Sequence, residues 1–575
     1  MAKQLNGAEI LVKSLEDLGV TNVFGYSGAT ILPVFHALSN SRIHITVNSN
    51  EQSCAFSAAG FSRAGDSVGI AVVTSGPAIT NTLTAVADSN ADSIPMIVFA
   101  GQVPQTRLGT DEFQHINVAG IFADAAKKVI LVSGNLSDIE TIVKDAYHYA
   151  RCGKPGPVVI DFPFDAQQRL GWYRQVDPEV YRCKYDQETH LGRNQCREFF
   201  KLLQRSKRPL LYIGGGLNSG EASDKIREFN RMFNIPSINS LMGKGILDES
   251  LDTSLGMLGM YGTPYSNMAI QETDLFVAFG VRWNDRVVQK VGEEGLNADI
   301  AYIDIHAEKV QEVRVTRYPE FSFIGDARTV LEDLLHYAKT EKITLQIEEW
   351  RKKTLDMKRL CPLNYRRNAP LLQQAEVIHM LSGYIDENTI IATGVGNHQM
   401  LAAQYLKTHR PKSFLTSGAF GSMGFCLPCA VGAHFAAPSK KVVAIDGDSC
   451  IKMNMGEIHT IGSLGLPIKV LLLNNHVDGM VRNIQAVEYG GVYTATERNF
   501  NADFSRIASE CGFSFCRKVE DRKDLSGAMR DFLAAEGPCF LEVVTDPDEM
   551  VYPKVPLGKG YKDMVLGPYI SWQEG

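Results

Sequence analysis

The sequence has no hydrophobic segment long enough to cross a membrane and no excess of positive charge. None of its apolar runs approaches the roughly 20 residues that a membrane-spanning helix needs. Lys and Glu are spaced through residues 1–19, which predicts a helix rather than a signal peptide. With 58 Lys and Arg against 65 Asp and Glu, the net charge is −7, which argues against a general nucleic-acid binder. We expect a cytoplasmic protein that binds neither membranes nor nucleic acid.

A disulfide framework is also not expected. The 11 cysteines are scattered over 575 residues, and in a cytoplasmic protein they are predicted to be free thiols. Cys426 and Cys429 have C-x-x-C spacing, but Leu427 and Pro428 between them belong to an apolar run. Packing in the core is therefore favoured over redox chemistry for this pair.

Short apolar segments, each followed by a turn and a helical pattern, recur along the chain and predict buried strands. Strands that alternate with helices form parallel sheets covered on both faces. The prediction is an α/β protein made of three doubly wound parallel-sheet domains. The predicted strands lie at 69–77, 95–104, 157–163, 209–216, 274–281, 301–305, 389–396, 442–445, 468–473 and 539–546.

Two polar stretches, 176–195 and 342–370, interrupt this pattern and indicate where the domains divide. The first and third domains are candidates for distant structural repeats, although no sequence identity between them is visible. We place the domains at 1–185, 186–345 and 360–545, followed by a C-terminal tail at 546–575.

The segment 442–475 carries the strongest functional signal. Its two predicted strands are followed by Asp448 and by Asn475, so a carboxylate and a carboxamide should meet at the edge of a parallel sheet where ligands bind. Their oxygens suit a hard cation that also holds phosphate, and the main-chain carbonyl of Val477 is predicted to join them. The alternative is a strand–helix–strand unit whose polar strand ends have no special role.

This segment is similar to the metal–diphosphate motif of thiamin diphosphate enzymes, GDG…NN, with Ser449 in place of the second Gly. A helix that begins after Gly447 would also attract the diphosphate. A second contact is predicted in 393–400, where glycines permit close approach and polar side chains can donate, although the His of this loop could simply cap a helix. The residues predicted to line the cofactor here are Val395, Asn397, His398, Gly447, Ser449, Cys450 and Met480.

Glu51 opens a helix of small residues after a short strand. In isolation it reads as a solvated Glu in the first turn of a helix, favoured by the helix dipole. In a thiamin diphosphate enzyme, however, a carboxylate on the pyrimidine N1′ lets the cofactor's own 4′-imine take the proton from C2, a relay of general acid–base catalysis. Met423 also allows two interpretations. It could simply fill the core, or it could be the bulky residue that bends the cofactor in thiamin diphosphate enzymes.

The ordered motifs of the whole chain resemble the catalytic subunit of acetolactate (acetohydroxyacid) synthase along nearly its full length. The resemblance implies that the middle domain holds FAD without redox turnover, although the three glycines alone could form a plain turn. The motifs are GYSGATILPVFHAL, TSGP, GQVP, LGTDEFQ, KPGPVVIDFP, LLYIGGGLNSG, LGMYGTPYSN, AFGVRWNDR, YIDI, GVGNHQM, TSGAFGSMGF and GMVRNI. The positions matched to FAD are Gly214, Gly215, Gly216, Asp285, Arg286, Asp304 and Asp326.

The resemblance also implies the reaction: pyruvate loses CO₂, and its remaining two-carbon unit is transferred to a second carbonyl compound. Gln114 matches a residue that assists at the active centre, the turn at Gly28 and Ala29 matches an oxyanion-binding turn, and Phe113 matches an apolar wall. Arg286 matches an Arg near the acceptor carboxylate, with an ion pair at the flavin or a domain interface as the alternative. The active site of this family lies between two subunits, so a homodimer or homotetramer is implied.

Departures from the family concentrate on the acceptor side. Ile484 stands where the family has Trp, and Asp478 stands where it has an apolar or amide residue. These changes suit a larger acceptor and disfavour an anionic one. The activity they suggest is similar to that of the flavoenzyme of yersiniose-type branched-sugar biosynthesis, which moves an acetyl unit onto a keto-sugar nucleotide. A simple 2-ketoacid decarboxylase, a non-catalytic relative and a flavin-dependent oxidation of the intermediate are the further alternatives.

Overall fold

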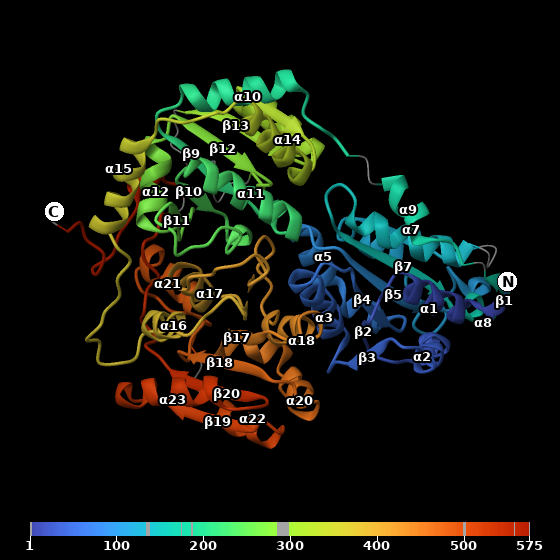
Figure 1. Ribbon diagram of the computed structural model, residues 1–575. Coiled ribbons are helices and arrows are strands. Elements are labelled where there is room, and N and C mark those ends of the chain that lie inside the picture. Colours follow the sequence, from blue (N-terminus) through green and yellow to red (C-terminus); the bar gives the residue numbers. More distant parts are fainter. Residues whose placement is uncertain are drawn as a thin grey trace.

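Three six-stranded parallel sheets, each covered by helices, make up the computed structural model (Figure 1). It describes residues 3–133, 138–173, 175–185, 188–283, 298–497, 502–556 and 558–573. This architecture confirms the predicted fold class, while the domain boundaries given above remain a prediction. None of the helices in these ranges combines the length and the apolar character that crossing a membrane requires. The ten cysteines whose side chains are described are free thiols.

The first sheet has the strand order β3-β2-β4-β5-β7-β6. Alternate residues of β4 (Gly69–Val73) point to opposite faces, so that Ile70 and Val72 join one core and Ala71 and Val73 join another. The remaining strands are β2 (Asn22–Gly25), β3 (His44–Val47), β5 (Met96–Gln102), β6 (Lys128–Leu131) and β7 (Pro157–Pro163), with β1 (Lys3–Asn6) and β8 (Leu170–Tyr173) in a small antiparallel pair. The helices are α1 (Gly7–Asp17), α2 (Leu32–Ser39), α3 (Glu51–Ala64), α4 (Pro77–Asn81), α5 (Leu83–Asp92), α6 (Val118–Phe122), α7 (Ile139–Arg151), α8 (Phe164–Gln168) and α9 (Pro178–Tyr185).

The middle sheet has a different order, β11-β10-β9-β12-β13-β14. Numbered along its own chain segment this is 3-2-1-4-5-6, the order of dinucleotide-binding doubly wound folds. Its strands are β9 (Pro209–Ile213), β10 (Ser237–Asn239), β11 (Ser254–Met257), β12 (Leu275–Phe279), β13 (Asp299–Asp304) and β14 (Phe321–Ile324). Its helices are α10 (Arg193–Arg205), α11 (Gly220–Phe233), α12 (Pro264–Glu272), α13 (Ala307–Arg317), α14 (Ala327–Thr340) and α15 (Glu348–Leu360).

The third sheet, β16-β15-β17-β18-β20-β19, repeats the order of the first when the strands of each are numbered along the chain. The shared order supports the hypothesis that these domains are structural repeats. Its strands are β15 (Thr389–Thr393), β16 (Phe414–Leu415), β17 (Lys441–Gly447), β18 (Ile468–Asn474), β19 (Phe515–Val519) and β20 (Cys539–Val544). Its helices are α16 (Gln374–Ser382), α17 (Asn397–Tyr405), α18 (Cys426–Ala436), α19 (Asp448–Ile451), α20 (Gly456–Ser463), α21 (Gly479–Glu488), α22 (Phe504–Glu510) and α23 (Arg522–Ala534).

Helices α3 and α18 join the first and third sheets. They lie together between the blue and the orange parts of the chain in Figure 1, and a single apolar core includes residues of both helices and both sheets. Their backbones touch because each carries a glycine at the crossing: a Cβ at Gly60 would lie 2.3 Å from the carbonyl oxygen of Cys429, and one at Gly432 would lie 1.9 Å from that of Ser57. The buried Cys426 and Cys429 pack in this junction, as predicted.

A buried ion cluster reinforces the same junction. Arg63 of α3 donates to Asp88 (2.8 Å) and Asp92 (2.9 Å) of α5 and to the carbonyl oxygen of Thr416 (3.0 Å). Asp92 in turn accepts hydrogen bonds from the backbone N–H groups of residues 418 and 419. The chain segment that leads to Met423 is therefore attached to the first domain.

Replacing Gly60 or Gly432 by Ala is expected to destabilise the protein, because the new methyl group forces two backbones apart. The expected loss is about 1–3 kcal/mol per substitution, the usual cost of overpacking. Gly527→Ala is the matched control, since Gly527 lies within α23 with nothing within 4 Å of an added Cβ. That change should be neutral or stabilise by about 0.5–1 kcal/mol. Thermal unfolding measures both, and equal effects at all three positions would contradict the close approach.

Candidate active site

Asp448 and Asn475 meet at the carboxyl ends of β17 and β18. The two strands are paired in parallel through Gly447 and Leu473, so the residues that follow them emerge side by side. One end of the Asn475 carboxamide lies 2.9 Å from the carbonyl oxygen of Val477 and 3.1 Å from Oδ1 of Asp448. The amide can take either of two orientations. If its nitrogen lies at that end, it donates hydrogen bonds to both oxygens. With oxygen at that end three buried oxygens converge on one point, as ligands of a divalent cation do.

The loop between β15 and α17 packs against this point. His398 is buried, and burial lowers its pKa to about 3, so the imidazole is neutral. Its Nε2 lies 3.7 Å from Oδ1 of Asp446, whose pKa burial raises to about 7. A Cβ at Gly394 or at Gly447 would lie 2.8 Å from the imidazole, so both glycines are needed for this packing.

Cys450 holds two further segments at this point. Its Sγ accepts hydrogen bonds from the backbone N–H of Val395 (3.4 Å) and of Gly424 (3.2 Å). Met423 therefore lies beside the loop of Val395, and both side chains are half-buried. The Oγ of Ser449 and the Nε2 of His398 are buried without a hydrogen-bond partner among the described residues. These are polar atoms that a diphosphate could satisfy.

Asn397 has partners that the sequence did not indicate. Its Oδ1 accepts from Nδ2 of Asn483 in α21 (3.3 Å), and its Nδ2 donates to the carbonyl oxygen of Glu549 (3.4 Å). Asn397 thus connects the cofactor loop to α21 and to the C-terminal segment, in addition to any contact with a diphosphate. Met480, next to Gly479 at the start of α21, packs against the apolar core of the third domain.

Predicted residues of the first domain gather at the ends of β2 and β4. The turn at Gly28 and Ala29 leads to Thr30, whose hydroxyl contacts the hydroxyls of Thr74 (2.8 Å) and Ser75 (3.1 Å). Gly76 has φ +61°, and a Cβ there would lie 2.8 Å from Cβ of Gln114. The predicted oxyanion turn, the TSGP segment and Gln114 therefore lie next to one another.

Glu51 lies at the first position of α3, as the sequence predicts, and is half-buried. Its Oε2 accepts a hydrogen bond from Nδ2 of Asn81 at the end of α4 (2.9 Å). No hydrogen bond between described residues joins Glu51 to the group around Asp448. Phe113, predicted as an apolar wall, is 83% exposed in a single chain. Within one chain, therefore, Phe113 is not enclosed by the other half of the predicted site, whereas Asn50 and Gln52 beside Glu51 hydrogen-bond to Asn454 of the third domain.

The residues predicted to contact the acceptor lie at and beyond the start of α21. Asp478 immediately precedes the helix and Ile484 lies within it, and both are half-buried. The backbone N–H of Asp478 donates to the carbonyl oxygen of Thr496 (2.8 Å), so the loop after α21 returns to the beginning of the helix. The two residues therefore share one small unit of structure that adjoins Asn475.

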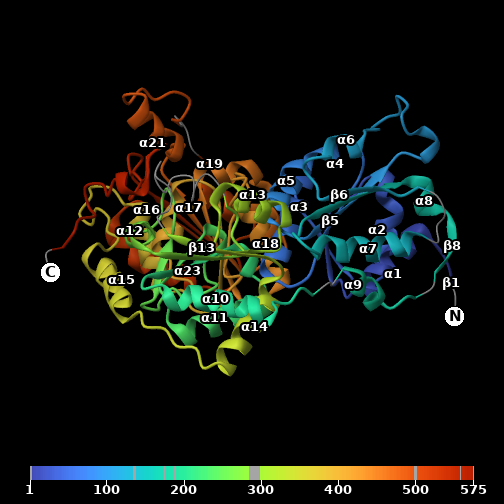
Figure 2. The same ribbon diagram turned by 90° about the horizontal axis from the view of Figure 1, so that it is seen from above.

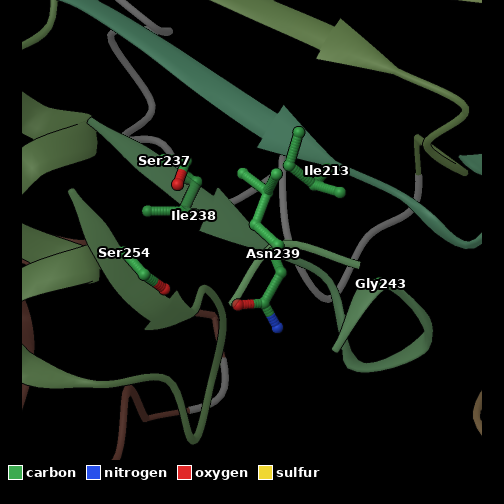
Figure 3. Close-up of a pocket in the computed structure, with 7 residues that line it drawn as sticks. Ile213, Ser237, Ile238, Asn239, Gly243 and Ser254 are labelled. Atoms are coloured by element: carbon green, nitrogen blue, oxygen red, sulfur yellow. The ribbon is translucent and has the colours of Figure 1, made fainter. Parts of the chain in front are cut away.

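The three glycines predicted to bind FAD follow β9, where the order of the middle sheet reverses between β9 and β12. This is the place where doubly wound sheets bind dinucleotides. Gly214 and Gly216 also pack on the backbone of Gly280, which follows β12. A cavity of about 10 Å³ beside β9 and β10 is large enough for one water molecule at most (Figure 3). It is not a cofactor site.

The acidic residues predicted in the middle domain differ in their surroundings. Asp304 ends β13, and burial raises its pKa to about 6 while its carboxylate accepts from the backbone N–H of His306 (2.8 Å). Asp326 is the N-cap of α14 and accepts from the backbone N–H of Arg328 (2.7 Å). Asp285 and Arg286 lie outside the described residues.

Sequence reasoning missed Asn81 and Asn483. Asn81 ends the short helix that begins in the TSGP motif, a signal that could have suggested it as a partner of the nearby Glu51. Asn483 is a buried amide on an otherwise unburied helix, and no local pattern identifies it.

Comparison with known protein families matches three separate segments of the chain. Residues 5–121 match the N-terminal TPP binding domain of thiamine pyrophosphate enzymes, residues 196–334 match the central domain, and residues 394–543 match the C-terminal TPP binding domain. Thiamine pyrophosphate is another name for thiamin diphosphate.

Relatives match over almost the whole chain. The chain is 36% identical to acetolactate synthase 1, chloroplastic, of Nicotiana tabacum over 97% of this chain and 84% of the relative. It is 35% identical to the acetolactate synthase large subunit of Corynebacterium glutamicum over 98% of this chain and 90% of the relative. It is 34% identical to the acetolactate synthase of Mycobacterium bovis over 97% of this chain and 90% of the relative. The resemblance inferred from the motifs is confirmed.

Replacing Asp448 by Ala is expected to abolish the stabilisation that Mg²⁺ and thiamin diphosphate together give the protein. A ligand at 100 times its Kd adds about 2.7 kcal/mol to the free energy of unfolding, which appears as a rise in Tm. Asp521→Ala, at an exposed carboxylate of the same domain, should keep the full rise. An undiminished rise in the Asp448 variant would contradict its assignment as a cation ligand.

Proposed function

Because the chain belongs to the acetolactate synthase family of thiamine pyrophosphate enzymes, we propose that it is a carboligase dependent on thiamin diphosphate, Mg²⁺ and FAD. Its donor substrate is pyruvate. The bond between C1 and C2 breaks, C1 leaves as CO₂, and C2 forms a bond to the carbonyl carbon of a second substrate, whose oxygen takes one proton. The overall reaction requires no oxidant or reductant.

The observation that carries this proposal is the convergence of Asp448, Asn475 and the Val477 carbonyl at the ends of β17 and β18. These oxygens would hold Mg²⁺ against the diphosphate, and the buried Ser449 and His398 would contact the phosphate oxygens. Bound thiamin diphosphate would supply a carbon nucleophile that stabilises the negative charge left by CO₂. Glu51 would hold a proton at the pyrimidine N1′, with its carboxylate kept in place by Asn81.

The remaining groups of the first domain would act on the substrate. The turn at Gly28 and Ala29 would face the developing oxyanion, and Gln114 would orient the substrate from the adjoining surface. Met423, fixed through its neighbour Gly424 to Cys450, would support the bent form of the cofactor.

FAD binding to the middle domain is supported by its strand order and by the three glycines at the point where that order reverses. Gly214 and Gly216 approach Gly280 so closely that no side chain fits between β9 and β12. Because carboligation is redox-neutral, the flavin would have a structural role in this reaction. Its position relative to Asp304 and Asp326 stays a prediction.

A second copy of the chain would complete the site. The family resemblance implies an active site between two subunits, and Phe113, the predicted apolar wall, is 83% exposed in one chain. We therefore propose a homodimer, or a homotetramer built from such dimers. The free thiols support a reducing, cytoplasmic location.

A ketone or nucleotide keto-sugar is the second candidate for the acceptor. A half-buried carboxylate at Asp478 would repel an anionic 2-ketoacid, and Ile484 leaves more room than the Trp of the family. The first candidate, a 2-ketoacid, is supported by the relatives. If no acceptor is held, the enzyme would act as a simple decarboxylase, with pyruvate and a proton giving acetaldehyde and CO₂.

Incubation with pyruvate, thiamin diphosphate, Mg²⁺ and FAD is expected to release CO₂ and form an equal amount of a carbon–carbon-bonded adduct. Parallel reactions contain pyruvate alone, a second 2-ketoacid, or a cyclic ketone, and the products are identified by mass spectrometry and NMR. Acetolactate without a ketone adduct would eliminate the keto-sugar alternative. Acetaldehyde as the sole product, or no CO₂ at all, would contradict carboligation.

Glu51→Gln is expected to lower kcat by about 10²- to 10⁴-fold, the range for losing a general acid–base group. Cofactor affinity and Tm should change little, because Gln can still contact Asn81. Glu179→Gln removes an exposed glutamate of α9 and serves as the control. Normal turnover by the Glu51 variant would refute the relay.

A further inference from the structure

Helix α21 buries little apolar surface, although Met480 in its first turn packs against the apolar core of the third domain. Figure 2 shows this helix and the loop after it standing out from the body of the third domain. Of its ten residues, Gly479–Glu488, the one buried residue is Asn483, which is polar. A helix of this length is marginal in water without tertiary contacts. Polar contacts are therefore needed, in addition to Met480, to fix where it lies.

Arg482 makes three of these hydrogen bonds. Its Nη2 donates to Oδ1 of Asp548 (2.8 Å), its Nε contacts the same oxygen (3.2 Å), and its Nη1 donates to Oε1 of Glu497 (2.9 Å). The guanidinium carbon lies 3.7 Å from the centre of the Tyr493 ring. The side chain is 12% exposed. We call Arg482, Tyr493, Glu497 and Asp548 the Arg482 clasp.

One side of the clasp is the loop that follows α21. Gln485 holds this loop to the helix, because its Nε2 donates to the carbonyl oxygen of Thr494 (2.9 Å) and its Oε1 accepts from Oγ1 of Thr496 (3.0 Å). Tyr493 and Glu497 of the clasp belong to the same loop. The helix and its loop therefore move together.

The other side of the clasp is the C-terminal segment, which is firmly attached. The carboxylate of Glu549 accepts from the backbone N–H groups of Gln374 (2.5 Å) and Ala375 (3.1 Å) at the start of α16. Asp548, which immediately precedes Glu549 in the chain, is the residue that Arg482 binds. The carbonyl oxygen of Glu549 accepts from Asn397, which also binds Asn483 of α21. The helix is thus tied at Arg482 and at Asn483 to one fixed segment.

We propose that Arg482 is a positioning residue for the second substrate, a role that rests on the proposed carboligation. The clasp fixes the angle of α21 and hence the place of Ile484 on the acceptor side. Arg482 itself is occupied by Asp548, Glu497 and Tyr493, so it acts through the helix and not on the substrate. When the helix is released, the acceptor binds less well. The two-carbon unit then takes a proton and leaves as acetaldehyde, where otherwise it would form the carbon–carbon bond.

Arginine is required because its planar group binds two carboxylates along its edges and stacks on a ring at the same time, which Lys cannot do. Glu497 and Asp548 are 59% and 68% exposed. Ion pairs with exposed partners add little to global stability. The effect of removing Arg482 should therefore be local, which separates a positioning role from a general structural one.

The test uses the full-length protein with Arg482→Gln, Arg482→Lys and the control Arg506→Gln, which removes an exposed arginine of α22 in the same domain. Hydrogen exchange followed by mass spectrometry should show roughly fivefold faster exchange over residues 479–497 in Arg482→Gln, the factor that loss of about 1 kcal/mol produces. Arg506→Gln should leave this region unchanged, and the Tm of all variants should stay close to that of wild type.

In the same variants the rate of CO₂ release at saturating pyruvate should stay within about twofold of wild type. The KM of the acceptor should rise roughly fivefold in Arg482→Gln, with a matching rise in the acetaldehyde fraction, and Arg482→Lys should restore part of both.

Each result decides a separate point. Unchanged exchange over residues 479–497 would overturn the clasp, whatever the activity. Faster exchange with an unchanged acceptor KM and aldehyde fraction would overturn the positioning role. Wild-type enzyme that releases no CO₂ from pyruvate would overturn the proposed function, and with it the role of Arg482 in acceptor binding.

Discussion

The crossing of α3 and α18 is the contact on which the rest of the structure depends. At Gly60 and Gly432 the two backbones touch, and one apolar core extends through both helices into the first and third sheets. Helix α3 begins at Glu51, and α18 follows directly on the segment that carries Met423. The crossing therefore sets two parts of the cofactor site relative to each other. The buried cluster of Arg63 with Asp88 and Asp92 attaches the Met423 segment a second time, through hydrogen bonds that orient it.

The proposed cofactor side and the proposed acceptor side of the site are held by different forces. Asp448 and Asn475 follow strands that are buried on both faces, so close packing keeps their separation constant. The acceptor side depends on α21, which has one buried residue and is tied by hydrogen bonds and ion pairs. Asn483 also links this helix to Asn397, which is predicted to line the cofactor. Asp478 and Ile484, which are predicted to line the acceptor pocket, lie just before this helix and within it.

How far the sequence predicts this structure depends on whether the information is local. Central strands such as β17 and β18 are continuous apolar runs, and parallel pairing then brings Asp448 and Asn475 together. Edge strands such as β6 and β19 were not predicted, since they are partly exposed and carry polar residues. The partners of Asn397 lie 86 and 152 residues away in the sequence, and Asp548 lies 66 residues from Arg482. No periodicity or motif joins positions so far apart.

The most direct test of the whole account is a crystal structure of the protein with thiamin diphosphate and Mn²⁺, in which anomalous scattering locates the metal. We predict one metal bound by Oδ1 of Asp448, the side-chain oxygen of Asn475 and the carbonyl oxygen of Val477, with the diphosphate beside His398 and Ser449. A metal bound elsewhere, or an Asn475 amide whose nitrogen still points at Asp448 when the cofactor is present, would contradict the site described for this chain.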